Sequence, residues 1–176
     1  MIGPRGDEVT VELRQYAGST GFSDDFHRVR DLLVRINQDG LATPGFSWGR
    51  WEWMFSLLYL AATSLSQIGV WEDDGEIVAV VTYETDTGFA SLLTDAEHAW
   101  LYPDLLAWAT TNLTRNGVIR ILVHNNDHEL EQAVAAHGLT GTQDREPNSA
   151  LELAHPTDNA ALAPIADVVV DNQSAR

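Results

Sequence analysis

The feature that most constrains the fold is the turn signal Asp73-Asp74-Gly75, which lies between two runs of strand-forming residues. These runs are Ile68–Glu72 and Glu76–Glu84, and the second is rich in isoleucine and valine. An Asp-Gly pair tolerates the positive backbone φ angles that a two-residue hairpin loop requires. The sequence therefore predicts a β-hairpin over residues 68–84.

Strand and helix patterns alternate on both sides of this hairpin. Val9–Arg14 alternates apolar and polar residues, which predicts a half-buried strand. Ser23 and Ser47 are suited to helix N-caps, and Gly40 is suited to ending the helix that follows Ser23. The other predicted elements are strands at Phe89–Leu93, Val118–His124 (buried) and Ser149–Leu153, and helices at Pro103–Leu113 and Leu130–His137. This order of elements predicts an α/β (α+β) fold.

Length and composition favour one core-bearing domain, which we place at residues 1–155 of the 176. Residues 156–176 consist largely of Ala, Asp, Asn and Pro, which predicts a flexible tail or linker. The first seven residues lack the apolar stretch of a signal peptide, and the apolar run Met54–Ala62 is too short to span a membrane. Together with the absence of cysteine, these features predict a soluble, cytoplasmic protein.

The acidic charge of the chain argues against some classes of partner. The chain has 26 acidic and 10 basic residues, all arginine, for a formal net charge of −16. Such a surface repels nucleic acid and anionic lipid, so we expect neither as a partner. We also expect no metal site, because His124 and His128 straddle a predicted strand end and helix start, where the spacing of helical metal ligands does not apply.

Several separated motifs resemble one family in the same order. They are Trp48-Gly49-Arg50-Trp51-Glu52, Ile68–Asp73, Ile77-Val78-Ala79, Leu105–Ala109 and Gly138-Leu139. On these motifs the chain resembles the GNAT superfamily of N-acetyltransferases, and in particular the N-terminal halves of tandem GNAT proteins. The resemblance implies a mixed central sheet of about six to seven strands flanked by about four helices. It also implies acetyl-CoA as the cofactor.

The resemblance places the pyrophosphate of acetyl-CoA on the junction before the third helix. The family's Gln/Arg-x-x-Gly-x-Gly/Ala loop falls here on His98, Leu101 and Pro103. Leu101 puts a branched side chain where the backbone should approach phosphate, and Pro103 lacks a backbone N–H. Asp95 and Glu97 add repulsion. We therefore expect a degenerate loop in which only a protonated His98 could donate to phosphate.

Other cofactor positions follow from the same resemblance. The implied cofactor-binding residues are Leu92, Leu93, Thr94, His98 and Asn126. The backbone of the strand Phe89–Leu93 would contact pantetheine, although Asn126 is equally suited to a strand-to-helix turn. The tyrosine that acts as general acid in many family members falls on Val134, which cannot donate a proton.

Candidate catalytic residues lie near the end of the hairpin's second strand. A carboxylate there could accept the proton that an amine loses when it attacks a thioester. Glu84 is the first candidate, with Asp86 and Glu72 behind it, and Tyr83 is a candidate proton donor. The alternative is that the acids are surface groups and that Tyr83 packs in the core.

The aromatic segment after Ser47 has two interpretations. Trp48, Arg50, Trp51 and Glu52 could line a groove in which a cationic amine contacts the tryptophan faces and Glu52. Helical spacing of Trp48, Trp51 and Phe55 instead favours core packing or a domain interface. Arg50 and Glu52 are two residues apart and would not face each other on one helix.

Two hypotheses for function remain. The first is an N-acetyltransferase that transfers acetyl from acetyl-CoA to a small-molecule or peptide amine, with weak activity because of its degenerate loop. The second is a catalytically inactive pseudo-GNAT domain that serves as a scaffold, dimerisation or ligand-binding module. The resemblance to tandem proteins suggests a homodimer or a second GNAT domain as partner. Fold alone does not decide between the two.

Overall fold

The predicted hairpin lies in the middle of the sheet. In the computed structural model, β2 (Gly69–Asp73) and β3 (Glu76–Thr82) pair antiparallel. Asp74 and Gly75 have φ angles of 47° and 79°. Positive values at both positions are those of a type I′ turn, which matches the twist of the flanking strands. The hairpin prediction is therefore confirmed.

The structure describes residues 10–37, 46–57, 60, 62–124 and 126–143. All of these belong to one compact unit, residues 1–145, while residues 146–176 form a second unit in which no residue is described. The predicted strand Ser149–Leu153, the helix end at Gly40 and the predicted tail at 156–176 lie outside the described residues.

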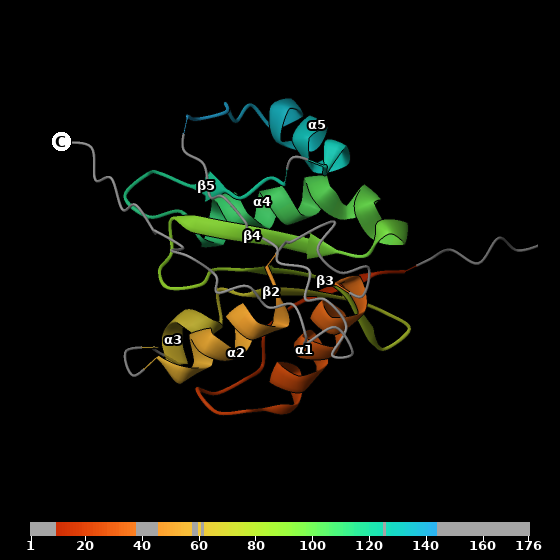
Figure 1. Ribbon diagram of the computed structural model, residues 1–176, viewed down its shortest axis with the longest axis vertical. Helices are drawn as coiled ribbons and strands as arrows, with labels where there is room; N and C mark the ends of the chain where they lie inside the picture. The colour runs from red at the N-terminus through yellow and green to blue at the C-terminus, as the bar shows by residue number, and fades with distance from the viewer. Residues whose placement is uncertain (1–9, 38–45, 58–59, 61, 125, 144–176) are drawn as a thin grey trace, which may run out of the picture. The chain divides into compact units, whose positions relative to one another are not determined.

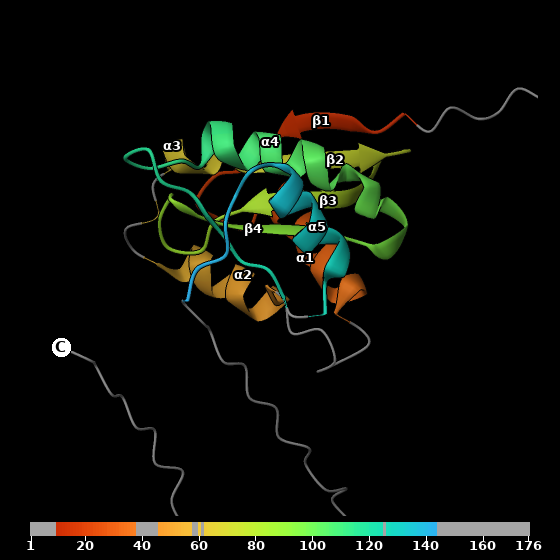
Figure 2. The same cartoon turned by 90° about the horizontal axis from the view of Figure 1, so that it is seen from above.

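Five strands form a mixed sheet in the order β1-β2-β3-β4-β5 (Figures 1 and 2). β1 (Glu12–Gln15), β2, β3 and β4 (Phe89–Thr94) pair antiparallel, and β5 (Arg120–Ile121) runs parallel to β4. The mixed α/β architecture that the sequence predicts is present, and the order of elements agrees with the resemblance.

The strand count among the described residues is five rather than the expected six to seven. The predicted buried strand Val118–His124 contributes only the two residues of β5. Val118 is 53% exposed and pairs back to Arg115 across the turn Asn116-Gly117. This local pairing satisfies the backbone at the start of the run, and so the strand there is shorter and more exposed than its β-branched residues indicate.

Helices cover both faces of the sheet (Figure 1). On one face lie α1 (Asp24–Ile36), α2 (Trp48–Ser56) and α3 (Ala62–Leu65). On the other lie the 3₁₀ helix η2 (Ala96–Leu101), α4 (Tyr102–Asn112) and α5 (His128–Ala136). Within the described ranges no helix has both the length and the apolar character needed to cross a membrane.

Both serine caps are confirmed. The Ser23 Oγ accepts the Phe26 N–H at 3.2 Å, and the Ser47 Oγ accepts the Arg50 N–H at 3.3 Å. Each cap satisfies a backbone donor that the first helical turn would leave unpaired. The starts of α1 and α2 are therefore determined by local sequence.

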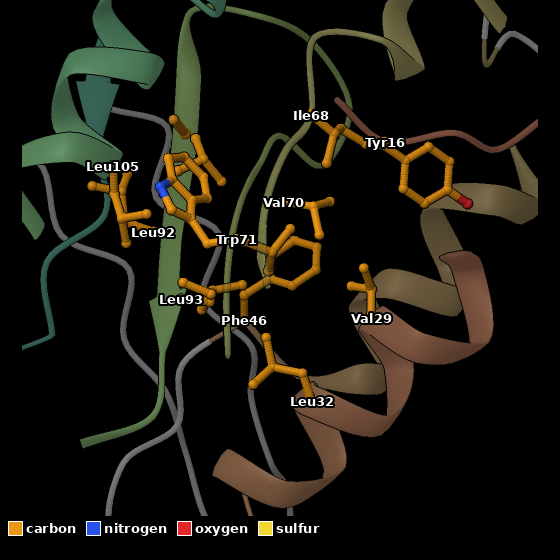
Figure 3. Packing of buried hydrophobic residues seen from close by; sticks show 14 of the residues in the cluster. Tyr16, Val29, Leu32, Phe46, Ile68, Val70, Trp71, Leu92, Leu93 and Leu105 are labelled. Carbon is orange, nitrogen blue, oxygen red and sulfur yellow. The ribbon is translucent and has the colours of Figure 1, made fainter. Parts of the chain in front are cut away.

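The core has two layers, one on each side of the sheet (Figure 3). Val70 of β2 points toward Val29 of α1, whereas its neighbour Trp71 points toward Leu105 of α4. All four side chains are at most 2% exposed. Successive strand residues point to opposite faces, so a sheet covered on both sides needs nearly continuous apolar strands.

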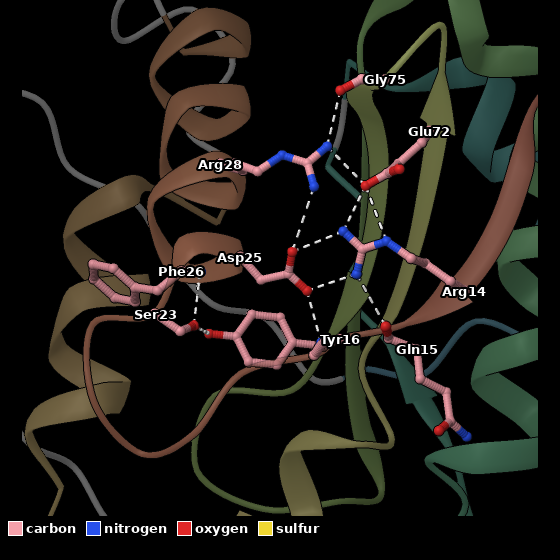
Figure 4. Close-up of polar contacts among 10 residues, drawn as sticks. Arg14, Gln15, Tyr16, Ser23, Asp25, Phe26, Arg28, Glu72 and Gly75 are labelled. Carbon is pink, nitrogen blue, oxygen red and sulfur yellow. Dashed lines mark hydrogen bonds and ion pairs between the residues drawn. The ribbon is translucent and has the colours of Figure 1, made fainter.

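A partly buried ion network joins β1, α1 and β2 (Figure 4). Arg14 donates to both oxygens of Asp25, at 2.6 and 2.7 Å, and to Glu72. Arg28 bridges the same two acids, and the Ala17 N–H donates to Asp25 at 2.7 Å. Burial alone would raise the pKa of Asp25, but the hydrogen bonds and positive charges around it lower that pKa overall. Asp25 is thus held ionised inside the domain.

Candidate functional site

Among the described residues, no strand pairs with the second edge of β4 over Ser91–Thr94, the half of the strand that carries the predicted cofactor residues. β4 pairs with β3 from Ser91 to Thr94, but its pairing with β5 involves only Phe89 and Ala90. In the described part of the chain, the last backbone bond across this edge is from Leu122 N to Ala90 O, at 3.1 Å. An extended ligand with amide groups could therefore pair with the backbone beyond Ala90.

Three of the predicted cofactor residues lie on this open segment. Leu92 and Leu93 are buried on opposite faces of the sheet. The backbone groups of successive strand residues point to opposite edges, and Ala90 bonds toward β5 whereas Asp95 bonds toward β3, so the backbone of Leu92 faces the open edge and that of Leu93 faces β3. The Thr94 hydroxyl donates to the Val78 carbonyl at 3.1 Å and is already used inside the fold. Recognition here would therefore depend on backbone groups and not on these side chains.

The strand β4 does not lead directly into α4, because a short 3₁₀ helix lies between them. Residues 96–101 form the 3₁₀ helix η2, and the Tyr102 N–H donates to the Ala99 carbonyl. Asp95 caps η2 by accepting the His98 N–H at 3.1 Å. Pro103, in the first turn of α4, has no N–H. The backbone donors that would bind an anion at a helix N-terminus are therefore largely used or absent.

His98 lies between two carboxylates. Its Nδ1 is 2.6 Å from Asp95 Oδ1, and its Nε2 is 3.4 Å from Asp73 Oδ2. Partial burial lowers the pKa of His98, but the hydrogen bonds and negative charges of the two acids more than offset this and raise the pKa overall. Both ring nitrogens are thus engaged within the fold, and the protonated ring is neutralised before any phosphate could approach.

A second hydrogen bond at this end of the sheet was not anticipated from the sequence. The Tyr102 hydroxyl donates to Asp127 Oδ2 at 2.7 Å, and Asp127 Oδ1 caps α5 through the Leu130 N–H. Burial and the adjacent carboxylate raise the pKa of Tyr102. Asp127 is recognisable from sequence as a cap three residues before Leu130, but its tyrosine partner is 25 residues away.

The remaining predicted cofactor and general-acid positions lie on and before α5. Asn126 is exposed, and its N–H donates to His124 Nδ1 at 3.4 Å. Val134 is half-buried and packs against the core. The neighbouring residue 125 lies outside the described residues.

The two candidate catalytic residues, Tyr83 and Glu84, point to different surroundings. Arg50 binds Glu84 with two hydrogen bonds, one of them from Nε to Oε1 at 2.7 Å. Tyr83 is 2% exposed and its hydroxyl has no hydrogen-bond partner of normal geometry in the described structure. Burial raises the pKa of Tyr83, while the nearby Ser64 side chain lowers it to a lesser extent. Tyr83 therefore sits in the core, as the packing alternative predicts.

The aromatic segment does not form one groove. Trp51 is completely buried and its Nε1 donates to the Phe26 carbonyl at 3.1 Å, which corrects its assignment to a substrate groove. Trp48 is 43% exposed, with the Arg30 guanidinium 5.4 Å from its ring centroid. Glu52 accepts from the same arginine at 2.8 Å. Core packing explains Trp51, because the helical stripe that it occupies packs against Phe26 of α1 and Tyr16.

Arg50 and Glu52, as expected from their spacing, do not pair with each other. Arg50 binds Glu84 on the chain after β3, and Glu52 binds Arg30 on α1. The structure thus brings one predicted groove residue into contact with one predicted catalytic residue. In the described ranges no three His, Asp or Glu side chains converge as they would around a metal ion.

Comparison with known proteins found one kind of similarity. No family model matches the chain, and no curated protein matches it. Among solved structures, the chain is similar to the aminoglycoside N-acetyltransferase AAC(6')-Iy in complex with CoA. The TM-score is 0.44 and the identity 13%, over 85% of this chain and 99% of that one.

Proposed function

We propose that this chain is a GNAT-like acyltransferase domain that holds the pantetheine arm of acetyl-CoA along the open edge of β4 and transfers acetyl to an amine with low efficiency. The observation that carries the proposal is that, within the described ranges, the second edge of β4 has no strand partner beyond Ala90. A pantetheine arm contains two amides, which suit backbone pairing at such an edge. The motif resemblance supports the choice of ligand.

The site fits pantetheine and does not fit pyrophosphate. The backbone of Leu92 offers its amide groups to the open edge, whereas the junction after β4 presents Asp95 and Glu97. Negative charges near a phosphate weaken its binding, and the 3₁₀ turn has already used backbone donors. We therefore infer that the nucleotide half of the cofactor contributes little affinity.

Bound acetyl-CoA would supply the thioester acyl group for direct transfer. Among the chain's own residues, Glu84 would accept the proton that the attacking amine loses. Its carboxylate is held by Arg50, so this role requires the ion pair to open. A cationic amine could open it by competing with Arg50 for Glu84. The net charge of −16 would favour the approach of such a substrate.

A non-catalytic pseudo-GNAT domain is the second candidate. The observation that favours it is the engagement of both His98 ring nitrogens by Asp95 and Asp73. With no phosphate cradle, the domain would serve as a scaffold or as a ligand-binding module, with a second copy or a further GNAT domain as partner. A cytoplasmic location would suit either function, since the chain has no cysteine.

Calorimetric titration with acetyl-CoA and with S-acetylpantetheine, which lacks the nucleotide, tests both candidates. The acyltransferase proposal predicts that both ligands bind and that their dissociation constants agree within about threefold, a difference below about 1 kcal/mol. Asp95→Asn, which keeps the cap, should improve acetyl-CoA binding alone. Asp24→Asn, at an exposed position on α1, is the matched control.

Three outcomes separate the alternatives. If neither ligand gives a heat of binding at millimolar concentration, the acyltransferase proposal is contradicted and the non-catalytic domain is favoured. Acetyl-CoA binding that is more than about thirtyfold tighter than S-acetylpantetheine binding would contradict the inference that the nucleotide adds little. Binding of both ligands without thiol release in the presence of amines would retain the pantetheine site and reject the transferase.

A further inference from the structure

A groove lies away from the open edge of β4, beside the first strand of the sheet. It has a volume of about 740 Å³ and lies between β1 and the η2–α4 segment. β1 and β4 are separated in the sheet by β2 and β3, so this groove is distinct from the proposed cofactor edge (Figure 2). Its volume lies within the usual range of small-molecule sites.

The described walls of the groove combine aromatic and aliphatic side chains with the neutral polar residues Thr10, Gln15, Thr111 and Asn112 and with one acid. The lining residues that matter most are Val11, Leu13, Trp71, Trp100, Asp104 and Trp108. Leu13 and Trp100 are 48% and 57% exposed, unusually high values for large apolar side chains. Among the described lining residues none is Arg, Lys or His. In this part of the chain the groove therefore presents a mixed aromatic and polar surface with one negative charge, from Asp104.

One wall is held in a fixed position. The Trp108 Nε1 donates to the Gln67 carbonyl at 2.9 Å, and the ring meets Trp71 edge-on with centroids 6.1 Å apart. Gly69 makes this possible, because a Cβ there would lie 2.7 Å from Trp108 Nε1. A wall that is ordered before binding loses little entropy when a ligand arrives.

We propose that this groove binds a small organic cation with an apolar body, such as a substituted ammonium. Indole faces attract ammonium groups through the negative face of the ring, and Asp104 would complete the charge recognition. Charge also argues against a second copy as the occupant, since each copy carries −16. The inference does not depend on acetyl-CoA binding.

NMR titration of the intact chain with benzyltrimethylammonium tests the proposal through the indole N–H signals. The signals of Trp100 and Trp108 should shift saturably, and the signal of Trp53, which is on α2 and 47% exposed, should not. Trp100→Ala and Asp104→Asn should each weaken binding by about 3- to 30-fold, the range for one cation–π or charge contact. Trp53→Ala is the matched control and should leave the affinity unchanged.

Further arms of the experiment separate the occupants. A neutral molecule of similar size, 4-tert-butylbenzyl alcohol, should bind more weakly, and binding of the cation should persist in 0.5 M salt, which screens diffuse attraction. Any of three results would overturn the proposal: the alcohol binds as tightly as the cation, binding of the cation is lost in 0.5 M salt, or neither groove substitution changes the affinity. Self-association abolished by Leu13→Asp would assign the groove to a second copy instead. Trp100 and Asp104 are exposed, so both variants should fold, as circular dichroism can verify.

Discussion

The Nδ1 atom of His98 lies 2.6 Å from Oδ1 of Asp95, at the point where the resemblance places a phosphate-binding residue. The same carboxylate oxygen also accepts the backbone N–H of His98, at 3.1 Å. One acid therefore both caps η2 and orients the imidazole toward Asp73. The junction is therefore organised around an internal ion pair, in which the carboxylates of Asp95 and Asp73 bind the protonated His98 ring.

We predict that this ion pair makes stability depend on pH near neutrality. Because the pKa of His98 is raised in the folded state, its stabilising contribution is complete below the unfolded pKa of about 6.5 and is lost as pH rises through the folded value. His98→Asn should cost about 1 to 3 kcal/mol at pH 6, as expected for a hydrogen bond to a charged group, and less at pH 8.5. Urea unfolding at both pH values measures the difference, and equal losses would contradict the prediction.

Removal of the buried acid Asp25 should also destabilise the domain. Asp25→Ala leaves the partly exposed Arg14 with Glu72 as its acidic partner and the Ala17 N–H without its acceptor, and should cost about 1 to 3 kcal/mol, as for hydrogen bonds to a charged group. Asp24→Ala, at the exposed neighbouring position, is the control. The folded-state pKa values of Asp25 and Glu72 are lowered, so their contribution is present above about pH 4 and lost as pH falls through the folded values. Chemical denaturation between pH 3 and 7 should follow this course.

Two tyrosine-to-phenylalanine changes should have opposite effects. Tyr83→Phe removes a buried hydroxyl that has no hydrogen-bond partner of normal geometry among the described residues, with Ser64 nearby, and should be neutral or stabilising by up to about 1 kcal/mol. Tyr102→Phe leaves Asp127 without its donor and should destabilise by about 1 kcal/mol. Thermal unfolding of both variants distinguishes them. A marked loss of stability in Tyr83→Phe would show that its hydroxyl is bonded in solution.

Gly69 should tolerate no side chain. A Cβ there would lie 2.7 Å from Trp108 Nε1 and 2.9 Å from Cδ1, so Gly69→Ala should displace the indole and cost about 1 to 3 kcal/mol. Gly49→Ala on α2 is the matched control, because its Cβ would meet only Ser47 Oγ, at 3.7 Å. That change should be neutral or slightly stabilising, since alanine is the better helix former. Unfolding free energies and the Trp108 indole N–H signal report both effects.

Local patterns were enough to predict the elements whose signals are short-range. The Asp-Gly hairpin and the caps at Ser23 and Ser47 agree with prediction because each depends on residues within a few positions of one another. The run Val118–His124 was predicted less well. Its β-branched residues favour a strand, but strand formation requires a partner, and only two of its residues have one in β4.

The candidate site stays a prediction, and the structure adds contacts that local patterns did not indicate. The resemblance placed cofactor binding on the segment Leu92–Thr94 and on the junction at His98, where the acids were expected to disfavour phosphate. It did not indicate that Asp73, 25 residues earlier, would complete the pairing of His98. Trp48 and Trp51 are both tryptophans, three positions apart, yet Trp48 is 43% exposed and Trp51 is fully buried.

By itself, then, the sequence determined the order of the elements, the central hairpin, the starts of α1 and α2 and the acidic character of the chain. Only the tertiary structure decided which charges pair, which aromatic side chains are buried and where β4 is left open. The physical reason is distance along the chain: capping and turn preferences act between near neighbours, whereas the contacts Arg50–Glu84 and Tyr102–Asp127 join residues 34 and 25 positions apart. Such contacts form only once the sheet has brought their elements together.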